Sequence, residues 1–338
     1  MRSAGEPRNP QLTEEFATAV GSVRSGVRVI VGYDGDDPQV VWPVQLRRRR
    51  MAEPVGFPLA DFQGPLARGD LPFDPGGALA AAHLDTYDFD HLLYSPSALF
   101  ERWTRKSRPS PYIDLAGGLD AYHDLLAARG SDVIARCAYL RRRIERDIGA
   151  VQVDLDCQDP DVLDGLVAWK RSQYRATAAQ DSLAAPWRRD LLHYLHQNHT
   201  DDCTGSLSVL RADGQPIAMH FGLRSQRVFH YWFPVYDPAY GKYSPGLVLL
   251  MAIVQASAAH GFLQIDLGAG QQEYKRRLAT AERTLLGGSI ERPSVSVLGR
   301  RIEEHMGHLR ARAHVGSTLR AVRRSIEAPK KGGGPAEQ

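Results

Sequence analysis

The chain has 338 residues, of which 43% are hydrophobic and 24% are charged, and its formal net charge at neutral pH is +3. This length suggests two domains of ordinary size or one large domain, and the composition is that of a soluble globular protein. The small net charge gives no general argument for nucleic-acid binding, and no apolar run approaches the roughly 18 residues that a membrane-spanning helix needs.

Cysteine usage and the N-terminus bear on the compartment. The sequence has three cysteines, Cys137, Cys157 and Cys203, which is an odd number without Cys-x-x-Cys spacing. This usage fits a reducing compartment. Residues 1–10 are polar and lack the apolar core of a signal peptide. We therefore expect a cytoplasmic protein, for which peripheral contact with a membrane-bound assembly stays open.

The N-terminal half alternates short strands and helices. Residues 27–33 and 39–46 alternate on either side of Asp34-Gly35, which predicts a hairpin. Residues 51–77 are dense in Pro and Gly and predict a long loop, which is either a surface connection or the lining of a cleft. Beyond it we expect strands at 89–93 and 112–115 and helices at 77–83, 119–128 and 131–148, the last with a solvated basic face.

The second half opens with a strand at 151–155 and a helix that Asp159-Pro160 begins. Lys170, Gln173 and Tyr174 lie three and four apart and share one polar stripe of this helix, which either faces a substrate or is an exposed face. The next helix, from Pro186, carries a histidine at every third position: His193, His196 and His199. No carboxylate supports them, so we expect surface histidines and no metal site.

A second hairpin is predicted at 205–223 around Asp213-Gly214. It repeats the strand, Asp-Gly, strand pattern of the first hairpin, and this echo suggests two related halves.

The stretch 228–275 is the most informative. An aromatic and β-branched strand at 228–235 leads through a loop to Ser244, an expected N-cap, and an apolar helix at 247–259. The unpaired N–H groups and the dipole at that helix start favour a phosphate, and Gly246 allows close approach. A short strand at 263–267 then ends in a Gly268-x-Gly270 turn, and a last strand is expected at 284–290.

Four blocks in order resemble the CelD/BcsL-like acyltransferases of the GNAT superfamily: Tyr236-Asp237-Pro238, Tyr243-Ser244-Pro245-Gly246, Asp266-Leu267-Gly268 and Glu273-Tyr274-Lys275. Two further elements match, namely Asp61 with Phe62 and Pro65, and Lys170 with Gln173-Tyr174. The resemblance covers about 27–290 and implies an α/β fold of two tandem GNAT-like domains with mixed sheets flanked by helices. One departure is that Tyr243-Ser-Pro-Gly246 replaces the usual Gln or Arg followed by Gly-x-Gly or Gly-x-Ala.

The expected organisation has five parts. They are a disordered N-terminus at 1–10, an N-terminal GNAT-like domain at 11–150, a C-terminal GNAT-like domain with the donor-site motifs at 151–296, a basic helical segment at 297–328, and a disordered tail at 329–338.

The resemblance implies an enzyme that moves an acyl group, most simply acetyl, from an acyl-CoA to a hydroxyl or amine of a sugar, a polysaccharide precursor or a similar small acceptor. Direct attack needs a docked donor, a proton acceptor and hydrogen-bond donors to the developing oxyanion. The expected donor site, which binds acetyl-CoA or another acyl-CoA, consists of Tyr243, Ser244, Pro245, Gly246 and Leu247. The expected acceptor site consists of Asp61, Lys170, Gln173, Tyr174, His230, Trp232, Tyr236 and Asp237.

The expected catalytic groups are Asp266, Glu273, Tyr274 and Lys275. The two carboxylates are candidate bases, Tyr274 could protonate the leaving thiolate, and Lys275 could orient an acidic substrate. Structural roles compete, with Asp266 as a cap of the glycine turn and Lys275 as a partner of Glu273. His220 and His230 are further candidate bases that would face opposite environments if one side of their strands is buried.

Two other hypotheses stay open. Fem-type transferases share the double-domain plan and use aminoacyl-tRNA, in which case the basic helix and the C-terminal basic run would meet RNA phosphates. A scaffold without catalysis in a polysaccharide assembly would instead show a blocked 244–246 junction and a 266–275 segment that faces no cleft.

Overall fold

The computed structural model describes residues 8–67, 73–93, 98–294 and 297. Met1–Ile290 form one compact unit and Glu291–Gln338 a second. The predicted basic helix beyond residue 297 and the predicted tail at 329–338 lie outside the described residues.

The helices are short to medium in length. Their bounds are η1 Pro10–Leu12, α1 Glu14–Val23, α2 Pro75–Ala81, α3 Ala98–Glu101, α4 Gly118–Ala128, α5 Val133–Asp147, α6 Pro160–Ala176, α7 Pro186–Gln197, η2 Pro238–Tyr243, α8 Pro245–Ala259 and α9 Glu273–Leu278.

The strands alternate with these helices along the chain. Their bounds are β1 Val27–Asp34, β2 Asp37–Arg48, β3 Met51–Pro54, β4 Leu66–Ala67, β5 Thr86–Leu92, β6 Thr104–Asp114, β7 Val151–Asp154, β8 Thr204–Ala212, β9 Gln215–Arg224, β10 Val228–Tyr236, β11 Gln264–Asp266 and β12 Ala281–Glu291.

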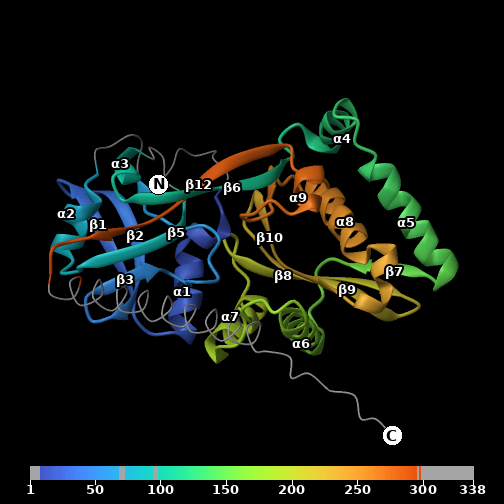
Figure 1. The fold of residues 1–338 in the computed structure, drawn as a ribbon, viewed down its shortest axis with the longest axis horizontal. Coiled ribbons are helices and arrows are strands. Elements are labelled where there is room, and N and C mark those ends of the chain that lie inside the picture. Colours follow the sequence, from blue (N-terminus) through green and yellow to red (C-terminus); the bar gives the residue numbers. More distant parts are fainter. Residues whose placement is uncertain (1–7, 68–72, 94–97, 295–296, 298–338) are drawn as a thin grey trace, which may run out of the picture. The chain divides into compact units, whose positions relative to one another are not determined.

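These strands form one mixed sheet of 12 strands in the order β1-β2-β3-β5-β12-β6-β11-β10-β9-β8-β7, with β4 paired to β2 (Figure 1). The β3–β5 and β10–β11 pairs are parallel. The hairpin pairs β1–β2 and β8–β9 are antiparallel. The predicted fold class, a mixed α/β arrangement flanked by helices, is confirmed.

The two predicted halves interleave within this sheet. β12, from the end of the chain, lies between β5 and β6, and β6 pairs on its other edge with β11. Helices α4 and α5 precede residue 150 but pack with α8 in one hydrophobic cluster. The tandem division at residue 150 stays a prediction.

Helices cover both faces of the β8–β10 region. Residues of α1, α6 and α7 share a core with one face, and residues of α4, α5 and α8 share a core with the other (Figure 1). The apolar residues of the predicted 247–259 helix are therefore largely buried, as expected for α8. His220 and His230 are both fully buried, because helices cover both faces of the sheet here; the condition under which they would face opposite environments, burial of one side alone, does not hold.

Three segments differ from their sequence-based expectation. The predicted strand at 112–115 is the end of β6, an 11-residue strand whose first half is exposed and charged. The predicted loop at 51–77 begins with β3, which pairs with β2 and β5. Asn9 and Pro10, expected in a disordered terminus, are buried, because the Asn9 side chain reaches the sheet and donates to Asp266 Oδ2 at 2.6 Å.

Candidate functional site

The site begins where β10 and β11 separate. The two parallel strands pair only from Val228 to His230 on β10, opposite Gln264 to Asp266 on β11. β10 continues to Tyr236, and its register with β9 shifts between His230 and Phe233. At this irregularity the Trp232 N–H donates to His220 Nε2 at 3.1 Å. A strand that runs on without its parallel neighbour leaves an opening in the sheet.

The start of α8 lies beside this opening. Ser244 occupies the N-cap position but has left-handed backbone angles, φ 47 and ψ 53, and its side chain makes no capping hydrogen bond. Ser244 is therefore the N-cap residue, as expected, but it does not cap with its side chain, because the 3₁₀ turn η2 brings the chain to the helix in the left-handed region. Pro245 has no N–H, and in the described part of the chain no hydrogen bond involves the Gly246 N–H, so this donor and the positive end of the helix dipole are available to a ligand.

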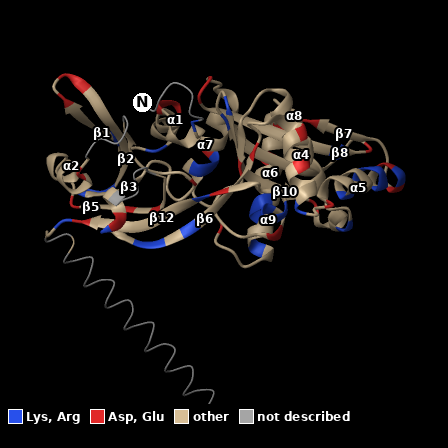
Figure 2. Cartoon of the chain, turned by 90° about the horizontal axis from the view of Figure 1, so that it is seen from above, with Lys and Arg blue, Asp and Glu red and all other residues tan. Residues whose placement is uncertain are grey.

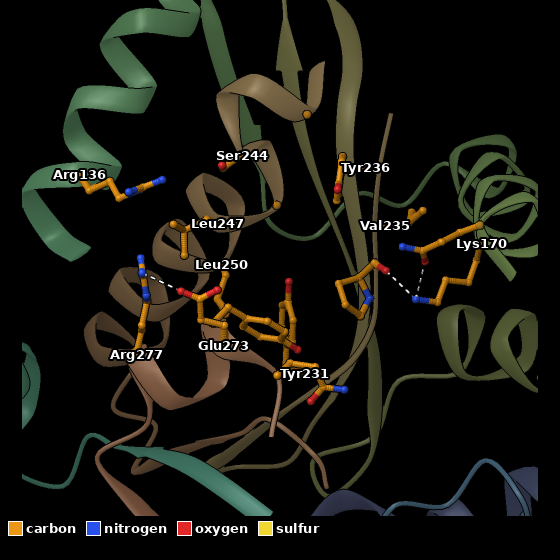
Figure 3. Close-up of a pocket in the computed structure, with 16 residues that line it drawn as sticks. Arg136, Lys170, Tyr231, Val235, Tyr236, Ser244, Leu247, Leu250, Glu273 and Arg277 are labelled. Carbon is orange, nitrogen blue, oxygen red and sulfur yellow. Dashed lines mark hydrogen bonds and ion pairs between the residues drawn. The ribbon is translucent and has the colours of Figure 1, made fainter. Parts of the chain in front are cut away.

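A pocket of about 600 Å³ occupies the opening (Figure 3). Its lining combines apolar, aromatic and charged side chains from α5, α6, β10, α8 and α9. The residues are Arg136, Lys170, Gln173, Tyr231, Pro234, Val235, Tyr236, Gly241, Ser244, Gly246, Leu247, Leu250, Gln272, Glu273, Tyr274 and Arg277. Such a mixture suits a ligand with an apolar arm and an anionic end.

Two arginines give this pocket positive charge. Arg136 of α5 reaches it from the side of the α8 N-terminus, and Arg277 of α9 lies nearby, as Figure 3 shows. Arg277 forms an ion pair with Glu273 at 2.7 Å. Because the Glu273 side chain is 68% exposed and held by Arg277, its environment favours orienting the arginine over acting as a base.

Three tyrosines form the aromatic part of the wall, namely Tyr231, Tyr236 and Tyr274. Burial raises the pKa of Tyr231 and of Tyr274 well above the ordinary tyrosine value. Both hydroxyls therefore stay protonated at neutral pH, and Tyr274 can donate a hydrogen bond or a proton inside the pocket.

Asp61 and His230 form a pair next to this wall. His230 Nε2 lies 3.1 Å from Asp61 Oδ2, with the histidine fully buried and the aspartate side chain 29% exposed. The loop that carries Asp61 is held in place because Gln11 Oε1 accepts from the Asp61 and Phe62 N–H groups. Burial acts to raise the pKa of Asp61, but the hydrogen bond and charge of His230 outweigh it, so this pKa lies below its ordinary value. Neither residue lines the pocket.

Asp266 and Lys275 lie beneath the pocket rather than in its wall. Asp266 is 1% exposed and pairs with Arg283 at 2.9 Å, so it is neither a cap of the glycine turn nor a neighbour of the pocket space. Lys275 Nζ donates to the carbonyls of Gly268 and Ala269 at 3.1 and 2.8 Å. It holds the turn instead of pairing with Glu273, and burial lowers its pKa to about 8.

Other predicted site residues have packing contacts. Tyr243 is buried, with the Arg143 guanidinium 5.2 Å from its ring centroid, and Asp237 caps η2 by accepting from the Ala239 N–H. Trp232 Nε1 donates to the Leu59 carbonyl at 3.0 Å. Neither these residues nor Pro245 and Tyr174 line the pocket, whereas the following predicted residues do: Lys170, Gln173, Tyr236, Ser244, Gly246, Leu247, Glu273 and Tyr274.

The structure adds residues that the sequence did not single out, namely Arg136, Tyr231, Leu250, Gln272 and Arg277. Arg277 could have been found from its position four residues after Glu273 on one helix. Arg136 could not, because a basic helix face is the usual pattern of a solvated surface.

The predicted surface histidines of α7 differ among themselves. His196 is 3% exposed and its Nε2 lies 2.8 Å from the Cys157 carbonyl, so it is a core residue. Across the described ranges, no group of three or more His, Cys, Asp or Glu side chains is arranged to hold a metal ion. Within the same ranges, no helix has the length and apolar character needed to cross a membrane.

Comparison with known families gives one match. Residues 131–276 match the family described as acetyltransferase (GNAT) domain. This segment runs from α5 into the first residues of α9 and contains every pocket residue except Arg277. This domain match supports an acyltransferase. The finer resemblance to the CelD/BcsL-like group stays a prediction, and comparison with curated proteins gave no match.

Solved structures share the fold at low sequence identity. FemX matches with a TM-score of 0.58 and 8% identity, covering 89% of this chain and 96% of its own. The C-terminal domain (DUF2156) of a proposed lysylphosphatidylglycerol synthetase from Agrobacterium fabrum matches with a TM-score of 0.54 and 11% identity, covering 86% and 90%. A conserved protein of unknown function from Bacteroides thetaiotaomicron matches with a TM-score of 0.52 and 11% identity, covering 83% and 92%. These likenesses concern the fold alone.

Proposed function

We propose that this acyltransferase takes its acyl group from an acyl-CoA, most simply acetyl-CoA. The observation that carries the proposal is the pocket at the start of α8, where the Gly246 N–H, Arg136 and Arg277 can meet a pyrophosphate. Leu247, Leu250 and Val235 offer an apolar path for the pantetheine arm between this anion site and the tyrosines. The thioester would then lie near Tyr274.

We further propose that the acceptor is an amine or hydroxyl of a sugar, a polysaccharide precursor or a similar small molecule. The acceptor attacks the thioester carbonyl, the C–S bond breaks, and Tyr274 donates a proton to the leaving thiolate. The Tyr274 hydroxyl is protonated at neutral pH and lines the pocket, so it can supply this proton. Asp266 and Lys275 contribute by holding Arg283 and the 268–270 turn, and the partly exposed Asp61 carboxylate, held by the buried His230, would contact the acceptor beside the pocket wall.

Three buried thiols support a cytoplasmic location for this reaction, since Cys137, Cys157 and Cys203 are all unpaired. The scaffold hypothesis required a blocked 244–246 junction. Ser244 and Gly246 instead line the pocket, together with residues 272–274, which favours catalysis.

Calorimetry with acetyl-CoA, longer acyl-CoAs and free CoA tests the donor. Saturable binding at about 0.15 M salt is expected, with the preferred chain length showing how much apolar room the pocket offers. Absence of saturable binding by every CoA species would remove acyl-CoA as the donor. Thiol release from acetyl-CoA with a panel of amino sugars and neutral sugars then tests the acceptor.

A second candidate donor is aminoacyl-tRNA, as in Fem-type transferases. The observation that favours it is the exposed basic surface of β6 and α9, which are in contact and appear blue in Figure 2; it includes Arg108 and Arg276. If this donor is correct, the affinity for bulk tRNA in a filter assay should fall by about tenfold or more between 50 and 200 mM salt, because binding to phosphates releases counterions. No CoA species should then bind.

A further inference from the structure

The amine of Lys170 is held in a fixed position at the edge of the pocket. From α6, Nζ donates to the Pro234 carbonyl at 2.8 Å and to Gln173 Oε1 at 3.0 Å. It also lies 5.4 Å from the Tyr174 ring centroid. Figure 3 shows this side chain opposite Glu273 and Arg277 across the pocket. Both acceptors come from elements that form the wall, so the amine cannot turn freely.

The hydrogen-bond count distinguishes the two protonation states. A neutral amine has two N–H groups and one lone pair, whereas an ammonium has three N–H groups and no lone pair. Pro234 O and Gln173 Oε1 take two N–H groups. The remaining position is open to the pocket that Lys170 lines, and in the neutral form this position is a lone pair.

The surroundings make the neutral form easier to reach than in an exposed lysine. Burial lowers the pKa of Lys170 to about 8, and among the described residues no carboxylate forms an ion pair with Nζ. The titratable and charged groups around the same space, on α5, α6, α9, β9 and β10, are Arg136, Tyr174, Tyr231, Tyr236, Glu273, Tyr274, Arg277 and the neighbouring His220. The one carboxylate of this set, Glu273, is paired with Arg277.

We propose that Lys170, in its neutral form, is the general base that removes the proton from the attacking acceptor. This inference rests on the proposed acyl-CoA reaction. As the acceptor N or O forms its bond to the thioester carbon, its proton passes to Lys170 Nζ. The C–S bond then breaks, and the thiolate takes a proton from Tyr274. Proton transfer from the Lys170 ammonium to the Tyr274 phenolate, directly or through water, restores both groups, so acyl-CoA and acceptor become the acylated product and CoA.

Gln173 then acts as a positioning residue, since it touches Nζ and not the reacting atoms. Its oxygen and the Pro234 carbonyl direct the two N–H groups away from the substrate. This arrangement explains why the polar stripe of α6 pairs a lysine with a glutamine three residues later.

A ligand-free experiment tests the state of the amine. The chain has six lysines, Lys106, Lys170, Lys242, Lys275, Lys330 and Lys331, so competitive labelling with trace acetic anhydride and peptide mass spectrometry resolves each one. Lys170 labelling should rise with an inflection near pH 8, well below the value of about 10.4 for an unperturbed lysine side chain. An inflection of Lys170 near 10 would overturn the proposal whether or not an acceptor is known.

A kinetic experiment tests the role. With acetyl-CoA and the amino sugar that gives most thiol release, Lys170→Met should lower kcat by about 10²- to 10⁴-fold and change the Kd for acetyl-CoA less than about threefold. Lys170→Arg, which keeps a cation but offers no lone pair at any accessible pH, should lose as much. The wild-type kcat/KM should rise with pH through an inflection near 8 that Lys170→Met lacks, and Lys106→Met is the matched control.

The outcomes separate the two proposals. Wild-type turnover in Lys170→Arg, or activity that falls as pH rises through 8, would mean that Lys170 acts as a cation and would overturn the base. Absence of CoA binding by the wild-type protein would overturn the proposed donor, and this inference with it. Normal acetyl-CoA binding without turnover in Lys170→Met and Lys170→Arg is the expected result.

Discussion

Replacing Gly246 by valine tests the anion site at the start of α8 with little disturbance of the fold. A Cβ built at this position meets only Tyr236 Cδ1, at 3.6 Å, which is an ordinary van der Waals contact. The backbone there does not need glycine, because Gly246 is absent from the residues with positive φ. Valine methyl groups would nevertheless crowd the approach to the N–H group that faces the pocket.

The two expected effects differ in size. Valine is a better helix residue than glycine by a few tenths of a kcal/mol, so the free energy of unfolding should change by less than about 0.5 kcal/mol. A hydrogen bond to a charged group contributes about 1.5–3 kcal/mol. Its loss should raise the Kd for acetyl-CoA by about 10- to 100-fold.

Calorimetry with acetyl-CoA measures the affinity, and thermal unfolding measures the stability. Gly246→Ala adds only the tolerated Cβ and should weaken binding less than about threefold. Gly165→Val is the matched helix control, because a Cβ at Gly165 of α6 meets nothing within 4 Å. Unchanged acetyl-CoA affinity in folded Gly246→Val would remove the α8 junction from the donor site.

Three further predictions concern stability and reactivity. Arg283→Met leaves Asp266 buried without its ion-pair partner and should lower the free energy of unfolding, measured in urea, by about 3 kcal/mol. The control Arg146→Met removes an exposed ion pair and should change this free energy by less than about 1 kcal/mol. Equal effects of the two variants would contradict the burial of the Asp266 ion pair. Asp61 has a lowered pKa, so its carboxylate stabilises the fold above its ordinary pKa of 3.8 and this contribution is lost as pH falls through the lowered value. The stability difference between wild type and Asp61→Asn should therefore be largest near neutral pH and shrink below about pH 4 in urea titrations; a difference that grew on acidification would refute the sign. Burial raises the pKa of the three thiols of Cys137, Cys157 and Cys203. Iodoacetamide at pH 8 should therefore label them only after unfolding, and rapid labelling of the native protein would contradict their burial.

Local patterns in the sequence were sufficient for the elements that depend on neighbouring residues. The hairpin at Asp213-Gly214 forms as predicted, with both residues at positive φ. The apolar helix after Ser-Pro-Gly is α8, and the glycine turn at Gly268 and Gly270 also has positive φ at both positions. These features were predictable because turn conformation and helix propensity act over a few residues.

Pairing with distant segments of the chain determines that residues 104–114 form the strand β6. Its first half reads as a polar loop because it is charged, and Pro109 and Pro111 interrupt the stretch at its middle and in its second half. In the fold β12 pairs along this half, while β11 pairs only with residues 112–114. The proline carbonyls accept from the Leu267 and Gly270 N–H groups, where the chain leaves the β11 ladder. A strand whose partners lie 150 or more residues away leaves no periodic signal in its own window.

The candidate site shows the same division. By itself the sequence determined which residues stand at the α8 junction and on the α6 stripe, because motif order and helical spacing place them. Only the tertiary structure decided that Arg136 and Arg277 share the pocket, that Asp266 lies beneath it in an ion pair, and that His230 is buried behind Asp61. The physical reason is that burial and charge pairing depend on distances between distant segments, which packing of the sheet and its helices sets.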